Sequence, residues 1–193
     1  RLMVVSPLEL FVTYIKLGLV GGLGLAMPYL LLQIWLFVSP GLYAREKRWV
    51  GPFVLCGTLF FLGGAAFAYS LVLPIGFHYL VQMTPKDIVQ NYSVAEYYSL
   101  VTHMMLAFGL VFELPLLMWV LSAASLVKPE TYSKLRKYWI VAAFIVGGVL
   151  TPPDPFTQMF MAVPLILFFE LGILGSRFLY RRHQATADQP ASV

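Results

Sequence analysis

Three carboxylates are notable for the segments in which they lie. Glu113 and Glu170 interrupt long apolar stretches, and Glu46 lies in a short basic segment between Arg45 and Arg48. An ionised side chain inside a bilayer costs about 2.5 to 3.5 kcal/mol on the insertion scale, so an intramembrane acid needs a partner or a proton. A carboxylate at a membrane surface can instead bind a guanidinium through two parallel hydrogen bonds. The candidate chemistry is therefore proton handling or recognition of a cationic or polar partner.

Each carboxylate leaves two interpretations open. Glu113 is either a protonated acid bonded to a neighbouring helix or a polar docking point for another protein's helix. Glu170 lies on about the same helix face as Arg177, so the two side chains could meet by snorkelling, or Glu170 could be purely structural. Physical chemistry alone favours Glu46 as a solvated loop charge, and its alternative is binding of an arginine-bearing ligand with Phe37 as an adjacent apolar contact.

The composition places these residues in a membrane protein. Of the 193 residues 60% are apolar and 11% charged, whereas soluble domains carry about a quarter charged residues. Mean hydropathy is +0.79. The single cysteine, Cys56, excludes an intrachain disulfide and a cysteine metal site. We expect no cofactor and no metal. We also expect no nucleic-acid partner, because the net charge of +4 reflects loop cations of a membrane protein.

Uncharged stretches long enough to cross a hydrocarbon core of about 30 Å predict the fold. We expect an all-α integral membrane protein with a single transmembrane domain over residues 1–193 and a cytoplasmic tail over 177–193. The five predicted helices cover about residues 15–38, 52–75, 95–125, 138–151 and 155–176. The last two are short. Prolines inside the spans predict bends and a concave scaffold; they are Pro28, Pro74, Pro115 and Pro164.

The distribution of Lys and Arg predicts the orientation. The segments 39–50 and 126–137 and the tail are basic, and with five alternating helices they fall on one side of the membrane. The positive-inside rule makes that side cytoplasmic, so the start of the chain lies outside. An outside start without Met or an export signal is most simply explained by a preceding membrane helix, which gives six spans in the intact protein.

Five separated motifs, in order, resemble the TatC family across essentially the whole chain. The first is residues 37–43, Phe-Val-Ser-Pro-Gly-Leu-Tyr, followed by Arg-Glu-Lys-Arg at 45–48, and the second is Ala-Phe-Gly-Leu-Val-Phe-Glu-Leu-Pro at 107–115. The others are Leu-Thr-Pro-Pro-Asp at 150–154 with Gln158, Ala-Val-Pro at 162–164, and Phe-Glu at 169–170.

The resemblance implies a core receptor subunit of the twin-arginine translocation system rather than an enzyme. Such a protein binds twin-arginine signal peptides and, in a multimeric complex with the small membrane proteins TatA and TatB, moves folded proteins across the bacterial cytoplasmic membrane using the proton motive force. The residues implied to bind the signal peptide are Phe37, Leu42, Tyr43, Glu46 and Arg48. Glu113 and Glu170 are implied intramembrane polar contacts, and the partner helix is expected to dock on Val149, Leu150, Thr151, Asp154 and Gln158.

Two other classes of function compete with this interpretation. A proton-coupled small-solute transporter would use Glu113 and Glu170, but the sequence has no internal repeat and no paired broken helices. An intramembrane enzyme would need a nucleophile with its base, or a metal set, at one depth, and the sequence offers neither. One departure from the family is that its N-terminal cytoplasmic segment, which supplies a second arginine-binding glutamate, has no counterpart in this sequence.

Overall fold

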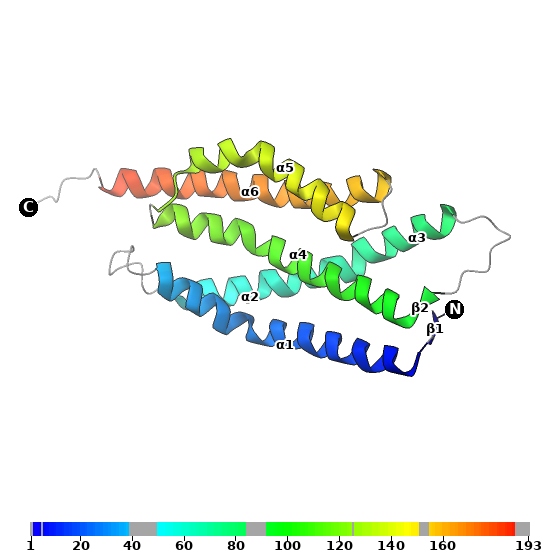
Figure 1. Ribbon diagram of the computed structural model, residues 1–193. Coiled ribbons are helices and arrows are strands. Elements are labelled where there is room, and N and C mark those ends of the chain that lie inside the picture. Colours follow the sequence, from blue (N-terminus) through cyan, green and yellow to red (C-terminus); the bar gives the residue numbers. More distant parts are fainter. Residues whose placement is uncertain are drawn as a thin grey trace, which may run out of the picture.

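The computed structural model describes residues 2–4, 6–38, 50–83, 92–124, 126–150 and 155–187. The helices are α1 (Pro7–Val38), α2 (Val50–Phe67), η3 (Ala68–Val72), α3 (Leu73–Met83), α4 (Val94–Ala123), α5 (Pro129–Leu150) and α6 (Pro155–Ala187). Because α2, η3 and α3 follow one another without a break, they form one helical segment. The described chain thus contains five helical segments, which confirms the predicted all-α architecture (Figure 1).

Several helices are longer than predicted. The first begins at Pro7 rather than near residue 15, the second continues to Met83, α5 begins at Pro129 rather than 138, and α6 continues to Ala187 rather than 176. The prediction counted only uncharged windows, but backbone hydrogen bonding continues through polar turns until a breaker intervenes. The last two helices are therefore not short as whole elements.

Four helical segments are long and apolar enough to cross a membrane, namely Pro7–Phe37, Val50–Tyr79, Val94–Ala123 and Gln158–Tyr180. The fifth, α5, is excluded from this group because its first turns carry four charged residues, Glu130, Lys134, Arg136 and Lys137. Only the part of α5 beyond these residues is apolar. The prediction of a short apolar segment thus applies to part of α5 rather than to the whole helix.

A π-helical turn precedes one of the predicted membrane prolines. In η3 the hydrogen-bond register widens, so that the N–H of Leu73 donates to the carbonyl of Ala68. Pro74 follows directly and has no N–H to donate. A π turn is a known way to accommodate such a break, and it keeps the helix continuous into α3. The other three prolines, Pro28, Pro115 and Pro164, lie inside α1, α4 and α6.

The helices are arranged in an open row rather than a closed bundle. α4 is central and packs against α6 on one side and against α2 and α1 on the other, while α5 packs mainly against α6 (Figure 1). At one end, Leu2–Met3 (β1) and Tyr92–Ser93 (β2) form a two-residue parallel pairing beside the starts of α1 and α4. The start of α1 and the end of α6 lie at opposite ends of the molecule, as an odd number of traverses requires (Figure 1).

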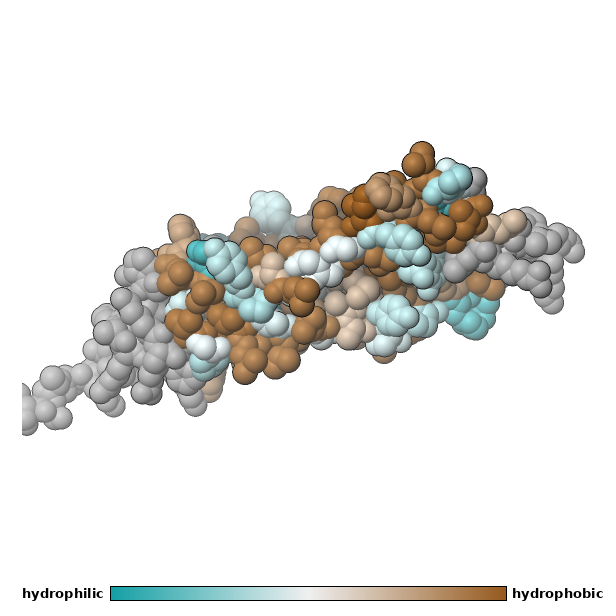
Figure 2. Space-filling view, turned by 90° about the horizontal axis from the view of Figure 1, so that it is seen from below, coloured by the Kyte–Doolittle hydropathy of each residue, from teal (hydrophilic) through white to brown (hydrophobic). Residues whose placement is uncertain are grey.

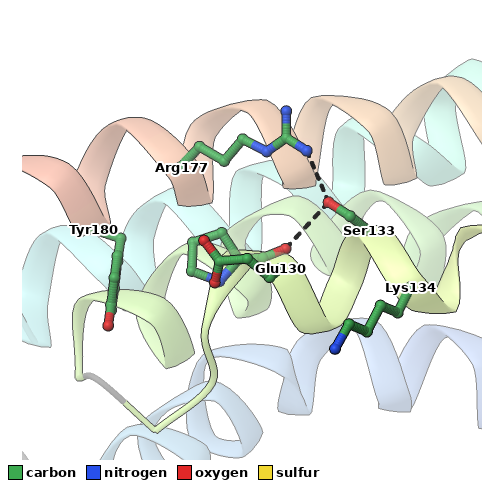
Figure 3. A pocket seen from close by; sticks show the side chains of 6 residues that line it. Glu130, Ser133, Lys134, Arg177 and Tyr180 are labelled. Atoms are coloured by element: carbon green, nitrogen blue, oxygen red, sulfur yellow. Dashed lines mark hydrogen bonds between the residues drawn. The ribbon is translucent and has the colours of Figure 1, made fainter.

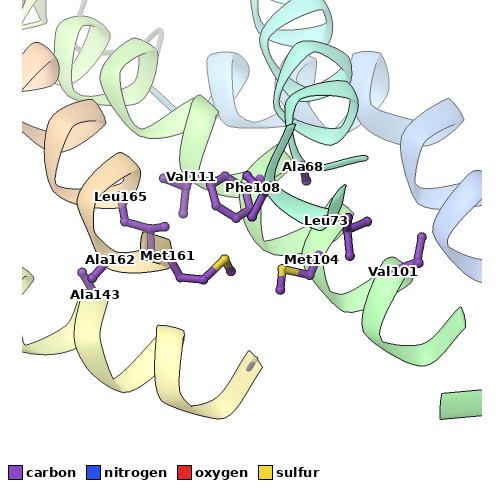
Figure 4. Packing of buried hydrophobic residues seen from close by; sticks show 11 residues of the cluster. Ala68, Leu73, Val101, Met104, Phe108, Val111, Ala143, Met161, Ala162 and Leu165 are labelled. Carbon is purple, nitrogen blue, oxygen red and sulfur yellow. The ribbon is translucent and has the colours of Figure 1, made fainter. Parts of the chain in front are cut away.

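Glycines let α2, α4 and α6 approach closely. A Cβ on Gly64 would lie 2.6 Å from the carbonyl oxygen of Phe108, and one on Gly109 would lie 2.7 Å from the ring of Phe61. In membranes, small residues at helix contacts allow this van der Waals packing. The largest buried cluster lies here, with Phe108 and Ala143 completely buried, and it extends from η3 to α6 (Figure 4).

The outward faces of the helices are apolar. On α6, exposed hydrophobic residues recur every three or four positions as Met159, Val163, Leu167, Leu171, Leu174 and Phe178. Figure 2 shows hydrophobic side chains over most of the visible described surface, with the most hydrophilic residues near the two ends. This distribution is expected for helices that face lipid.

Candidate functional site

Glu113 lies at the contact of α4 with α2. Its side chain is 3% exposed, and a Cβ on Gly57 would lie 3.1 Å from its Oε2. The carboxyl group lies near the backbone of Phe61, but neither oxygen has a hydrogen-bond partner among the described residues. Among the described residues, the interpretation of Glu113 as an acid bonded to a neighbouring helix therefore rests on this approach to Phe61 of α2 alone.

Two further buried polar atoms have no partner in the described part of the chain. They are the Nε1 atoms of Trp35 and Trp119. Trp35 belongs to a cluster with Leu31, Phe53 and Leu116, against which Trp119 packs. Buried polar atoms cost free energy unless they are hydrogen-bonded. The Trp119 atom lies against Gly175 of α6, whereas Glu113 lies against Gly57 of α2, so the unmatched groups of α1 and α4 are separate positions rather than one polar site.

Glu170 is bound by Arg136 and not by Arg177. The Arg136 Nε lies 2.6 Å from Glu170 Oε1, and Nη2 donates to Oε2 at 2.8 Å, so the pair is bidentate. Arg177 instead donates to Ser133 Oγ at 2.8 Å. Of the two interpretations left open by the sequence, the meeting of Glu170 with Arg177 is not observed, because α5 runs antiparallel to α6 and brings Arg136 to the depth of Glu170. The structural interpretation of Glu170 is the one that this geometry supports.

The antiparallel helices α5 and α6 form a hairpin, and the pairing of Arg136 with Glu170 in it could have been anticipated from the sequence. Residues 136 and 170 lie at equal separations from residue 153, near the middle of the connection between α5 and α6. The same antiparallel register brings Trp139 Nε1 to the carbonyl of Leu165 at 3.1 Å and Gln158 Nε2 to the carbonyl of Phe144 at 2.8 Å. Counting equal numbers of residues in both directions from the Thr-Pro-Pro-Asp sequence would have selected Arg136 as the partner of Glu170.

The residues predicted to dock a partner helix differ in availability. Val149 is 80% exposed at the end of α5, where Leu150 is the last helical residue. Gln158 already bonds to Phe144 and packs over Gly147 and Gly148, so its amide nitrogen stabilises the hairpin itself. Thr151 and Asp154 lie outside the described residues. Val149 is thus the member of this group that presents a free apolar surface.

Of the predicted signal-peptide residues, the structure describes only Phe37. It lies next to the end of α1 and is 86% exposed. Leu42, Tyr43, Glu46 and Arg48 lie outside the described residues. Next to this connection, α1 and the start of α2 enclose an apolar pocket of about 510 Å³, lined by Pro28, Tyr29, Leu32, Val50, Gly51, Val54, Leu55 and Thr58.

A fourth carboxylate, Glu9, was not singled out from the sequence. Its Oε1 accepts hydrogen bonds from the Ser93 hydroxyl and, at 2.7 Å, from the backbone N–H of Ala95. Ser93 is the N-cap of α4. A carboxylate at a helix N-terminus also interacts favourably with the helix dipole, so Glu9 joins the start of α1 to the start of α4. Its position in the first turn of α1 was a local signal, but its partner is 84 residues away.

Metal chemistry has no counterpart among the described side chains. Over the ranges that the structure describes, no group of three or more His, Cys, Asp or Glu side chains could hold a metal ion. The titratable groups of interest are instead single carboxylates placed on different helices.

Comparison with known proteins extends this picture. The family described as Sec-independent protein translocase protein (TatC) matches residues 1–164. A TatC protein of Desulforapulum autotrophicum is 40% identical over 183 residues, which cover 95% of this chain and 68% of the relative. The Escherichia coli TatC is 40% identical over 175 residues, covering 91% and 67%. A relative from Halothiobacillus neapolitanus is also 40% identical, and the chain spans 50% of its length.

Solved structures agree with the sequence relatives. Two crystal structures described as the twin-arginine translocase receptor TatC superpose with TM-scores of 0.81 and 0.80 at 39% and 38% identity. They cover 90% and 93% of this chain, and 78% and 79% of theirs. None of the proteins named here is a small-solute transporter, so that alternative has no support among them. Because the family match covers most of the chain, the chain belongs to the TatC family of Sec-independent protein translocase proteins.

Proposed function

We propose that this chain is the receptor part of a twin-arginine protein translocase, and that it binds twin-arginine signal peptides. The observation that carries the proposal is the similarity, over 90% of the chain, to a structure described as a twin-arginine translocase receptor. The open row of helices agrees with such a role, because its long uncovered faces are available to other membrane helices.

The signal peptide is proposed to bind at the connection between α1 and α2. Glu46 receives the arginine pair through bidentate hydrogen bonds, because the geometry of guanidinium matches that of a carboxylate. Tyr43 and Arg48 contribute further polar groups to this site, and Leu42 contributes an apolar contact. The exposed ring of Phe37 and the apolar pocket between α1 and α2 supply the nearby surface for the apolar part of the peptide.

Two partner contacts are proposed for the small membrane proteins TatA and TatB, in a multimeric complex driven by the proton motive force. One is Glu113, whose unmatched carboxyl would accept or donate a hydrogen bond when a partner helix packs beside it. The other is the end of α5, where Val149 is exposed and where Leu150, Thr151 and Asp154 are proposed to join the contact. Gln158 acts there by holding α5 against α6.

We further propose a position in the bacterial cytoplasmic membrane with the C-terminus in the cytoplasm, and no enzymatic activity. Lys16 of α1 bonds to Ser99 near the start of α4. Five other described cations lie on the turn before α5, on its first turns and in the last third of α6, namely Lys128, Lys134, Arg136, Lys137 and Arg177. In this antiparallel arrangement those segments lie at one end of the molecule. The positive-inside rule assigns that end to the cytoplasm.

The first test is export of a folded reporter carrying a twin-arginine signal peptide in cells that depend on this protein. Exchanging Glu46→Gln keeps the shape but removes the charge, so export should fall at least tenfold, the effect of losing a charge-assisted pair of about 1.5 to 3 kcal/mol. The control is Glu96→Gln, which changes an exposed acid in the first turn of α4 and should leave export unchanged. Normal export by Glu46→Gln would count against the proposed site.

A second test examines contact directly. A photoreactive residue in place of Tyr43 should crosslink in membranes to a signal peptide with Arg-Arg and lose that crosslink when the pair is Lys-Lys. Ammonium cannot reproduce the bidentate geometry of guanidinium. Equal labelling of the two peptides, or none, would make Glu46 an ordinary loop charge.

The partner contact at Glu113 has a separate test. Glu113→Gln keeps hydrogen-bonding capacity but cannot ionise, and Glu113→Leu removes both. If a partner helix forms a hydrogen bond here, crosslinking to the small subunits should survive the first substitution and fall severalfold in the second. Loss in neither variant would leave Glu113 without the proposed role.

A further inference from the structure

A polar pocket lies between the start of α5 and the end of α6, away from Glu113 and from the connection between α1 and α2. Its volume is about 500 Å³, and its lining residues are Pro129, Glu130, Ser133, Lys134, Arg177 and Tyr180. Figure 3 shows Arg177 and Tyr180 from α6 facing Glu130 and Ser133 from α5, with Lys134 on the other side of Ser133 from Arg177. None of the functions proposed above uses this pocket.

The pocket combines charges of both signs that are not neutralised within the described chain. Arg177 donates to Ser133 Oγ at 2.8 Å, and Ser133 donates to the carbonyl of Pro129 at 3.3 Å. The ion pair found among the described residues is Arg136–Glu170, so Glu130, Lys134 and Arg177 each keep their charge for another partner. Two cations, one carboxylate and a tyrosine hydroxyl are suited to a ligand that carries both a phosphate and an amine.

The position of the pocket along the helices corresponds to the headgroup region of a bilayer. On α5, Lys134 is followed at helical spacing by Tyr138, Val141 and Ile145, which are 63%, 59% and 60% exposed. On α6, Leu174 precedes Arg177 by one turn and is 59% exposed. Apolar tracks on both helices therefore lead from the pocket towards the membrane centre, which is the arrangement that acyl chains attached to a bound headgroup require.

We propose that this pocket is a binding site for a glycerophospholipid whose headgroup carries a phosphate and a primary amine. Arg177 and Lys134 bind the phosphate, Tyr180 adds a hydroxyl donor, and Glu130 binds the ammonium group. The two acyl chains lie along the exposed residues of α5 and α6. Since the pocket spans the contact between these helices, a bound lipid also holds the cytoplasmic ends of the hairpin together.

The test is native mass spectrometry of the whole chain in detergent, with phosphatidylethanolamine, phosphatidylglycerol or diacylglycerol added at equal concentration. We expect phosphatidylethanolamine to be retained most, phosphatidylglycerol less, and diacylglycerol, which has no phosphate, least. Arg177→Gln and Lys134→Gln should each lower retention of both phospholipids about fivefold, the effect of one cation at a membrane surface. Glu130→Gln should lower only the preference for phosphatidylethanolamine.

A matched control tests whether any cation of α5 would serve. Lys137→Gln removes a cation whose ammonium lies 5.0 Å from the centroid of the Tyr138 ring instead of in the pocket. This variant should retain lipid as the unmodified chain does. Equal retention of diacylglycerol, unchanged retention in Arg177→Gln, or displacement of the lipid by an equal concentration of soluble phosphoethanolamine would each overturn the proposal.

Discussion

Glu113 and Glu170 lie on neighbouring helices of one membrane protein but in opposite chemical situations. Glu170 is partly exposed at the α5–α6 edge and is bound by the Nε and Nη2 atoms of Arg136. Glu113 is buried at the α2–α4 contact among apolar side chains, and its oxygens have no partner in the described part of the chain. At the α5–α6 edge the intramembrane carboxylate is paired within the chain, whereas at the centre it is not.

The difference indicates which intramembrane polar groups have their hydrogen-bond partners within this chain and which do not. At the edge, Gln158, Trp139 and Arg136 each bond across the pair of helices α5 and α6, so these three polar side chains need no further partner. At the centre, stability comes from glycine-mediated close packing, which tolerates one costly polar group. A buried carboxyl without a partner is a site at which a further helix could contribute binding energy, and this is the physical basis for placing a partner contact there.

The largest expected effect concerns packing at the centre. Gly64→Ala places a Cβ 2.6 Å from a backbone oxygen of α4, so the helices must separate. We expect a loss of about 1 to 3 kcal/mol in the free energy of unfolding, measured by SDS titration of the purified chain. The neighbouring Gly63 has nothing within 4 Å of such a Cβ, so Gly63→Ala is the matched control and should change little. Equal losses would mean that close packing does not stabilise the centre.

The next effect concerns the carboxylate that joins α1 to α4. Glu9→Ala removes the acceptor of the Ser93 hydroxyl and of the Ala95 N–H, and should cost about 1.5 to 3 kcal/mol, as for hydrogen bonds to charged groups. Glu9→Gln keeps an acceptor oxygen without the charge and should lose less. The measurement is the same SDS titration. Indistinguishable losses in the two variants would contradict a role for the charge.

A smaller effect is expected at the edge. Because Arg136 and Glu170 are 46% and 33% exposed, their coupling energy in a double-mutant cycle should be about 0.2 to 1 kcal/mol. The cycle uses Arg136→Gln, Glu170→Gln and the double variant. A parallel cycle with Lys137→Gln should show additivity. Coupling in the Lys137 cycle as large as in the first would mean that the bidentate geometry adds nothing beyond charge.

The smallest effect is expected for Gln158. Replacing it with Leu removes the hydrogen bond to the carbonyl of Phe144, and interhelical hydrogen bonds in membranes average about 0.6 kcal/mol. A loss of that size in the unfolding titration, with crosslinking to small subunits retained, would support the role of Gln158 within the hairpin. Unchanged stability together with a loss of crosslinking would instead support the predicted role of Gln158 in docking a partner helix.

The sequence by itself determined the class of fold, the number of helical segments described here and the family. Long uncharged windows require helices, because a backbone in hydrocarbon must satisfy its hydrogen bonds internally. The same windows underestimated helix lengths, since polar turns at both ends continue the backbone bonding. Motif order identified the family without any knowledge of which side chains touch.

Only the tertiary structure decided which polar groups meet. Arg136 rather than Arg177 binds Glu170, and Glu9 reaches Ala95 across 86 positions of the chain, because both contacts depend on how separate helices align in depth and rotation. Likewise the isolation of Glu113 depends on Gly57 and on the apolar side chains around it. Sequence spacing fixes the neighbours of a residue along its own helix, whereas contacts between helices follow from the packing of the whole row.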